Sequence, residues 1–210
     1  MQKYGLIRSG IYPALFLILL WFIKIGEFYL HQDWYSWGIL PRSISGLKGI
    51  LFSPLIHGSF NHLLSNSGPL IILLTAIVYF YKKIALKIFL FSYLFVGLWV
   101  WVLARESYHI GASGLIYSFF GFLLFIGILR KQKAMLAISL ITILFYGSLI
   151  WGVLPQSPHV SWESHLFGFF TGIILAYYFK ENKSPFEKDN PIINDDQKYK
   201  NDFWNDVIEK

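Results

Sequence analysis

Long apolar runs separated by short charged connections dominate the chain. A helix that crosses a membrane needs about 20 apolar residues, and the first candidate covers about residues 11–30. Five further apolar runs follow, at about 60–81, 85–103, 113–129, 134–154 and 164–179. The pattern predicts an all-α, polytopic membrane protein with a six-helix bundle over residues 1–180. An even number of crossings places both termini on the same side.

Two segments break this pattern. The connector 31–58 is long and rich in Trp and Tyr, which is typical of chain lying at the lipid headgroup level. It predicts short helices or a partly embedded loop. Residues 181–210 are polar and acidic and predict a mostly disordered cytoplasmic tail. One short amphipathic turn around residues 203–208 is the alternative.

Composition supports a membrane protein and narrows its chemistry. Hydrophobic residues make up 55% of the chain and charged residues 14%, against about 25% charged in soluble domains. A single soluble domain of this size cannot bury so much apolar surface. The chain has no cysteine, which excludes disulfides, a thiol nucleophile and cysteine-ligated metals.

The basic residues indicate the orientation of the bundle. The net charge of +6 arises from +9 in residues 1–180 and −3 in residues 181–210. Most basic side chains fall on alternate connections, which the positive-inside rule assigns to the cytoplasm. They are Lys3, Arg8, Lys82, Lys83, Lys87, Arg130, Lys131, Lys133, Lys180 and Lys183. We therefore expect an inner-membrane protein with cytoplasmic termini, and we expect basic charge to report topology rather than nucleic-acid binding.

Polar side chains inside apolar runs are expensive, so each is a functional candidate. The first cluster opens the second predicted span. His62 and Asn66 are four residues apart and share one helix face. A neutral imidazole and a carboxamide on one face can donate hydrogen bonds to a single oxyanion. Hydrogen bonding between helices is the structural alternative.

The second cluster lies at the head of the fourth predicted span. Ser113 is flanked by small residues, including Gly114, and Tyr117 and Gly121 follow at four-residue steps on the same face. The head of a helix also offers free backbone N–H groups to a developing oxyanion. Taken alone, such a run of small residues is more often a packing seam.

The third cluster opens the last predicted span. His165, Gly168 and Gly172 share one face, and glycines four residues apart let two membrane helices approach closely. A base must come within about 3 Å of the hydroxyl that it deprotonates. A lone histidine at the end of a span is usually interfacial, but the predicted topology brings all three clusters to one membrane depth. Together they supply a nucleophile, a base and oxyanion donors.

The joint pattern resembles the rhomboid family of intramembrane serine proteases. It covers residues 10–180 and has three parts: His57-x4-His62-x3-Asn66, Gly111-x-Ser113-Gly114-x2-Tyr117-x3-Gly121 and His165-x2-Gly168-x3-Gly172. The resemblance implies a minimal six-span serine endopeptidase that cleaves membrane proteins within or near a transmembrane segment. It implies no cofactor and no metal.

The resemblance also implies a role for each site residue. Ser113 would be the nucleophile and His165 the general base of a dyad without a carboxylate. Tyr117 would pack against the His165 ring. His62, Asn66 and the Ser113 backbone N–H would bind the oxyanion, and His57 would stabilise the loop above the site.

Two features of the connections bear on this reading. Many rhomboids carry a Trp-Arg pair eight or nine residues before the first histidine, where this chain has Leu47, Lys48 and Gly49, so the anchoring of the connector is open. The Pro- and Ser-rich connection 155–162 could move over the site as a gate. A water-filled dip lined by polar residues is expected beside the site. Its expected lining is His57, Ser59, Asn61, His62, Ser65 and Asn66.

Three other functions are consistent with parts of the pattern. A non-catalytic relative would bind membrane clients without cutting them, but it would be expected to lack Ser113 or His165. A transporter or proton channel would more often carry acidic residues at mid-span. A metalloprotease would need a spacing such as His-Glu-x-x-His, which this chain does not have.

Overall fold

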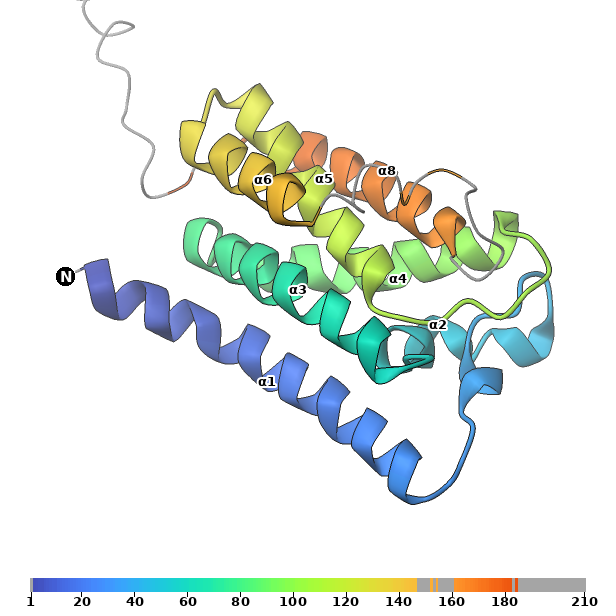
Figure 1. Cartoon of the computed structure of the whole chain (residues 1–210). Helices are drawn as coiled ribbons and strands as arrows, with labels where there is room; N and C mark the ends of the chain where they lie inside the picture. Colours follow the sequence, from blue (N-terminus) through green and yellow to red (C-terminus); the bar gives the residue numbers. More distant parts are fainter. Residues whose placement is uncertain (1, 147–151, 153, 155–160, 183, 185–210) are drawn as a thin grey trace, which may run out of the picture.

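The computed structural model describes residues 2–146, 152, 154, 161–182 and 184. These residues form a bundle of α-helices (Figure 1), so the predicted all-α fold is confirmed. The long helices are α1 (Gln2–Tyr29), α3 (Phe60–Phe80), α4 (Ala85–Leu103), α5 (Ser113–Leu129), α6 (Lys133–Phe145) and α8 (Trp162–Tyr178). They correspond in order to the six predicted runs.

Two predicted helix boundaries differ by more than two residues from the structure or lie outside the described residues. Helix α1 begins nine residues before the predicted start at residue 11, because helical hydrogen bonding does not require an apolar sequence. The Ser9 hydroxyl, for example, donates to the Gly5 carbonyl within the helix at 2.8 Å. The predicted fifth run, 134–154, is described as a helix only through Phe145, and most of its second half lies outside the described residues.

Three of the described helices are long and apolar enough to cross a membrane: Gly5–Tyr29, Phe60–Phe80 and Ala85–Leu103. They carry large apolar side chains on the outside of the bundle, as at Phe22 in α1, which is 73% exposed. Such exposure is unfavourable in water and favourable in lipid. Three such helices indicate a multi-pass membrane protein.

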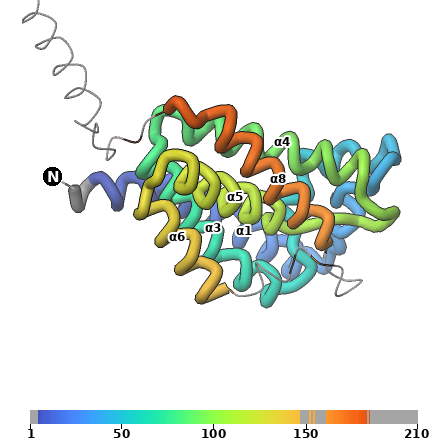
Figure 2. Tube along the Cα trace, turned by 90° about the horizontal axis from the view of Figure 1, so that it is seen from above, coloured from blue at the N-terminus to red at the C-terminus, as the bar shows by residue number. Residues whose placement is uncertain are grey.

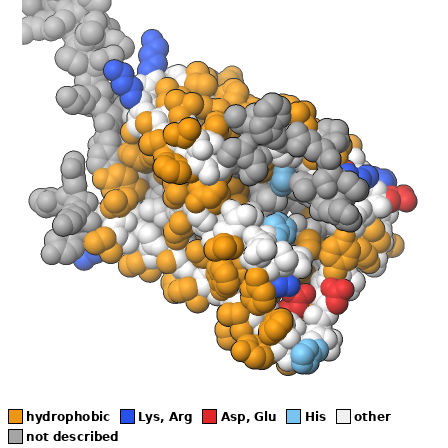
Figure 3. All heavy atoms as spheres, viewed as in Figure 1, with side chains coloured by type: hydrophobic (Ala, Val, Ile, Leu, Met, Phe, Trp, Pro, Cys, Tyr) orange, Lys and Arg blue, Asp and Glu red, His pale blue; other side chains and the backbone are white. Residues whose placement is uncertain are grey.

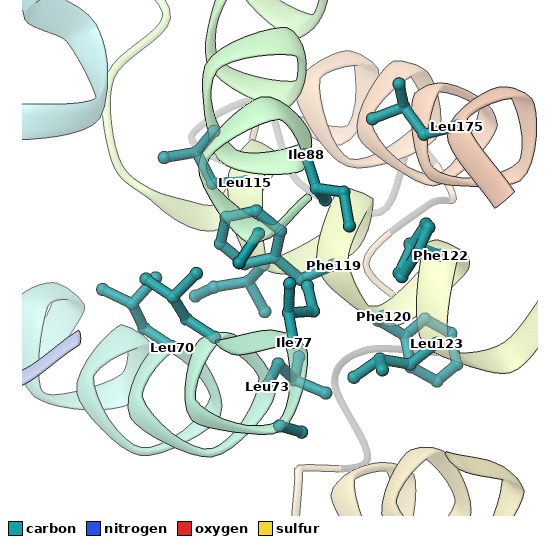
Figure 4. Close-up of a cluster of buried hydrophobic side chains, with 14 of the residues drawn as sticks. Leu70, Leu73, Ile77, Ile88, Leu115, Phe119, Phe120, Phe122, Leu123 and Leu175 are labelled. Carbon is teal, nitrogen blue, oxygen red and sulfur yellow. The ribbon is translucent and has the colours of Figure 1, made fainter. Parts of the chain in front are cut away.

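Helix α5 is the centre of the bundle. Thirteen of its 17 residues are buried, and its most extensive contacts are with α8, beside which it lies in both views (Figures 1 and 2). Phe119 and Phe122 of α5 are fully buried in an apolar cluster with side chains from α3, α4 and α8 (Figure 4). The helix is about 25 Å long at 1.5 Å per residue, and it is enclosed by its neighbours.

The connector after α1 folds into the short helices that its length predicted. They are η1 (Tyr35–Trp37), η2 (Ile44–Gly46), α2 (Gly49–Phe52) and η3 (Ser53–Leu55).

The connector is anchored without the Trp-Arg pair. Ile39 and His109 exchange two backbone hydrogen bonds of 3.0 and 2.9 Å, which join the connector to the loop before α5. The Arg42 guanidinium donates to the Ala104 carbonyl at 2.6 Å. The Trp101 indole N–H donates to the Ser43 carbonyl at 2.9 Å. An arginine and a tryptophan therefore anchor the connector, but they are Arg42 and Trp101 rather than a pair at positions 47–49.

Candidate active site

A serine and a histidine from two neighbouring helices meet inside the bundle. Ser113 is the first residue of α5 and His165 lies in the first turn of α8. The Ser113 Oγ is 2.8 Å from the His165 Nε2, which is hydrogen-bonding distance. Both side chains are buried, with 8% and 9% of their surface exposed. A hydroxyl bonded to an imidazole in this way has a base ready to accept its proton.

The second nitrogen of the same imidazole fixes its orientation. The His165 Nδ1 is 2.7 Å from the Gly152 carbonyl oxygen. A carbonyl only accepts hydrogen bonds, so the proton of the neutral ring sits on Nδ1 and Nε2 is free to accept from Ser113. The Tyr117 ring stacks on the imidazole with centroids 4.3 Å apart and planes 13° apart. A main-chain carbonyl thus takes the place that a carboxylate holds in a Ser–His–Asp triad.

Glycines allow α5 and α8 to approach this closely. A Cβ added to Gly168 would overlap the Gly114 carbonyl oxygen and lie 3.1 Å from its carbonyl carbon. One at Gly172 would overlap the Ser118 carbonyl oxygen, and one at Gly121 would lie 2.6 Å from the Phe169 carbonyl oxygen. The four glycines of the expected packing seam therefore lie along the close contact between α5 and α8. They are Gly114, Gly121, Gly168 and Gly172.

The loop that delivers Ser113 depends on Gly111 and His57. Gly111 has φ +106°, and an added Cβ would lie 2.7 Å from the His62 ring, so only glycine fits without strain. The next amide, of Ala112, donates to the His57 Nε2 at 3.3 Å. Burial, with a smaller contribution from His62, lowers the pKa of His57 from 6.5 to about 3. A neutral His57 can accept this hydrogen bond throughout the physiological range.

His62 and Asn66 lie on the neighbouring helix α3 and face the same loop. Ser59 caps α3 by accepting a hydrogen bond of 3.0 Å from the His62 amide, which fixes the backbone that carries this ring. The His62 Nε2 and the Asn66 Nδ2 both lie within 4 Å of one point beside the Gly111 Cα. The Asn66 Nδ2 is buried and has no hydrogen-bond partner among the described residues. A buried donor without a partner is costly unless a ligand accepts from it.

A cavity of about 680 Å³ opens between the end of α1 and the start of α3. His57, Ser59 and Ile110 line it, so it reaches the loop that holds Ser113, although the dyad itself does not line it. On the face drawn in Figure 3, histidine side chains reach the surface in a hollow near the middle of the molecule. Of the expected polar lining, only His57 and Ser59 border the cavity.

The suggested gate at 155–162 lies largely outside the described residues, which resume at residue 161. Within the described part of the chain, no three His, Asp or Glu side chains are grouped as metal ligands.

Sequence reasoning missed one functional group, the Gly152 carbonyl. A backbone carbonyl leaves no mark on the residue type, so no sequence signal could have found it. The arrangement as a whole places a proton acceptor against a hydroxyl and hydrogen-bond donors close to it.

Comparison with known proteins relates the chain to one family. The family model described as Rhomboid domain matches residues 45–182, which is more than half of the chain. An uncharacterized protein of Mycobacterium tuberculosis strain H37Rv is 32% identical over 105 residues, covering 45% of this chain and 42% of the relative. An uncharacterized protein of Mycobacterium leprae is 27% identical over 130 residues, covering 59% of this chain and 52% of the relative. The chain thus matches about half the length of these curated relatives.

Proposed function

The chain belongs to the rhomboid family, and we propose that it is an intramembrane serine endopeptidase that works through a Ser113–His165 dyad. The observation that carries the proposal is the 2.8 Å contact between the Ser113 Oγ and the His165 Nε2. Residues 1–180 would form the protease domain. Its substrates would be membrane proteins with a transmembrane segment, and neither metal nor nucleic acid would take part.

The first chemical step follows from the hydrogen bonds of the dyad. His165 takes the Ser113 proton on Nε2 while Oγ attacks the carbonyl carbon of the scissile peptide bond. The Gly152 carbonyl holds the proton of Nδ1, so the ring that becomes positively charged keeps its orientation. The C–N bond then breaks, and the leaving amine takes the proton from Nε2. An acyl-enzyme on Ser113 remains.

The oxyanion of the tetrahedral intermediate needs donors on the Ser113 side of the substrate carbonyl. The Asn66 carboxamide, the His62 imidazole and the Ser113 backbone N–H are the groups that we assign to it. The partnerless state of the Asn66 Nδ2 supports this role, because a donor held in place before the reaction costs no reorganisation. The Ser113 amide belongs to the first turn of α5, whose N–H groups have no acceptor within their own helix.

Hydrolysis of the acyl-enzyme requires water at the level of Ser113. Helix α5 is shorter than the roughly 30 Å of the hydrocarbon core, so Ser113 at its head would lie below the membrane surface. The cavity beside His57 and Ser59 supports a water supply from the outer face. His165 would accept a proton from that water as its oxygen bonds to the acyl carbon. The ester bond to the Ser113 Oγ would then break, Oγ would take the proton back from Nε2, and the new carboxyl end would leave.

The orientation that we propose has both termini in the cytoplasm and the dyad toward the exterior. The basic residues on alternate connections support it. Accessibility of single cysteines introduced at Ser59 and Lys131 to a membrane-impermeant thiol reagent tests it, since the parent chain has no cysteine. Labelling from outside is expected at position 59 alone, and labelling at position 131 alone would reverse the orientation.

The experiment that tests the activity uses purified protein in liposomes with a single-pass membrane substrate. Cleavage by the wild type, and no cleavage by Ser113→Ala or His165→Ala, is the expected result. Cleavage should continue in EDTA. Binding of the substrate without cleavage by a folded wild type would contradict the proposal and favour a non-catalytic client-binding role.

A further inference from the structure

A second serine–histidine pair lies four residues before the dyad in both chain segments. The His109 Nδ1 is 2.5 Å from the Ser161 Oγ. His109 precedes Ser113 by four residues, and Ser161 precedes His165 by four residues. The two pairs therefore join the same two segments in the same register, with the serine and the histidine exchanged. Both pairs span 52 residues of sequence.

The hydrogen bonds around the second pair have one consistent direction. The His109 Nε2 is 3.1 Å from the Arg105 carbonyl oxygen, which can only accept, so the ring proton sits on Nε2 and Nδ1 accepts from Ser161. The Ser161 oxygen then accepts from the Ser164 hydroxyl, 2.6 Å away. His109 is 2% exposed, and burial lowers the pKa of His109. The ring is therefore neutral at physiological pH and the chain of bonds is intact.

The two residues of the pair are held by different segments of the chain. The backbone of His109 is bonded to Ile39 of the connector, so this ring stands on the anchored loop that leads to Ser113. Ser161 is the N-cap residue of α8, and its carbonyl accepts from the His165 amide at 3.4 Å. Its hydroxyl does not cap the helix and bonds across to the loop instead.

An ion pair spans the same gap. The Arg105 Nε lies 3.5 Å from the Glu163 Oε1, and Glu163 is 3% exposed. Glu163 stands between Ser161 and His165 in the first turn of α8. The first turn of a helix is ordinarily the part that frays, whereas here two side-chain contacts tie it to the loop before α5.

We propose that His109 and Ser161 are positioning residues that set the first turn of α8, and with it His165, against Ser113. The assignment rests on the proposed protease function. The catalytic base sits in the first turn of a helix and has no carboxylate to orient it. The His109–Ser161 hydrogen bond lies four residues before the dyad in both segments. It therefore fixes the distance between the start of α5 and the start of α8.

The test measures the second-order rate constant with which a fluorophosphonate probe inactivates Ser113 in the purified protein. Ser161→Ala should lower it about tenfold, within the roughly 100-fold that a 1 Å misplacement can cost, and Ser161→Thr should restore it because the hydroxyl returns. His109→Ala should lower the rate to a similar extent. The double variant should be no slower than either single variant, since both remove the same contact.

Ser92→Ala is the matched control. Ser92 is a fully buried serine that bonds the Ser118 hydroxyl at 2.8 Å, so its loss also removes a buried hydrogen bond but leaves the first turn of α8 tied. It should lower the melting temperature while leaving the inactivation rate within about twofold of the wild type. A thermal melt of each variant shows whether it is folded. If Ser161→Ala does not fold, the inactivation rates of His109→Ala and Ser161→Thr test the positioning role.

The outcomes separate this inference from the function on which it rests. A wild type that does not react at Ser113 would overturn the proposed protease activity and this assignment together. A reactive wild type with an equally reactive, folded Ser161→Ala variant would overturn the positioning role alone. Probe attachment to Ser161 in the Ser113→Ala variant would also overturn it, because Ser161 would then be a nucleophile.

Discussion

The contact between α5 and α8 makes a sharp prediction for Gly168→Ala. The added methyl group would lie 3.1 Å from both the Gly114 carbonyl carbon and the Tyr117 Cβ, and it would overlap the Gly114 carbonyl oxygen. Carbon atoms in van der Waals contact are about 3.5–4.0 Å apart. The neighbouring atoms are backbone and Cβ atoms rather than flexible side-chain ends, so the two helices must separate by roughly 1 Å at this point.

The separation reaches the dyad because Gly168 lies one turn after His165 and Gly114 directly follows Ser113. Adding 1 Å to the 2.8 Å contact between the Ser113 Oγ and the His165 Nε2 takes it beyond hydrogen-bonding distance. A misplacement of this size costs about 100-fold in rate. Overpacking the helix contact should also lower the free energy of unfolding by about 1–3 kcal/mol.

The assay compares cleavage of the membrane substrate and thermal unfolding for Gly168→Ala and a control, Gly26→Ala. Gly26 lies in α1 and an added Cβ meets nothing within 4 Å. The control should keep full activity and gain up to about 1 kcal/mol from helix propensity. A Gly168→Ala protein with the activity and melting temperature of the wild type would refute the idea that close helix contact sets the dyad geometry.

Other substitutions separate the groups around the dyad. Asn66→Ala should lower kcat by about 100-fold or more with little change in KM, as expected for an oxyanion donor. A rise of about 100-fold in KM with unchanged kcat would instead indicate that Asn66 binds the substrate. Tyr117→Phe should keep the stacking on His165 and most of the activity, whereas Tyr117→Ala should lose the roughly 0.5–1.5 kcal/mol of an aromatic pair, or about 2- to 10-fold in rate. Acid should destabilise the fold through His57. Its folded pKa of about 3 lies below the ordinary 6.5, so the unfolded chain binds the proton first and stability is lost as the pH falls below 6.5. The loss is about 2 kcal/mol at pH 5. Melting curves at pH 5 and 7.5 should show a smaller difference for His57→Gln, and an unchanged difference would exclude His57 as the cause.

The helices and the proximity of Ser113 to His165 could be predicted from the sequence because membrane chemistry leaves few options. Apolar runs of fixed length predicted the order of the long helices, and the cost of polar groups in lipid singled out Ser113 and His165. The start of α1 was missed because its first turns are helical without belonging to an apolar run. An apolar run indicates where a helix crosses the membrane, whereas backbone hydrogen bonding determines where the helix begins and ends.

Contacts made by loops and by the backbone could not be predicted. The Gly152 carbonyl that bonds His165 is common to every residue type. The His109–Ser161 contact joins a loop to a helix cap, so no helical or strand period relates the two positions. The connector is anchored by Arg42 through the Ala104 carbonyl, an acceptor that sequence comparison does not identify. The fold brings the partners of each contact together, and their residue types alone do not indicate that they meet.

In the proposed mechanism, the Ser113 hydroxyl is a nucleophile activated by His165. Mass spectrometry of peptides from the fluorophosphonate-treated protein tests it most directly, with wild type, Ser113→Ala and His165→Ala compared at equal probe concentration. One adduct is expected, on Ser113, and it should be absent from Ser113→Ala and strongly reduced in His165→Ala. An adduct on another residue, or one on Ser113 that forms equally fast without His165, would contradict it.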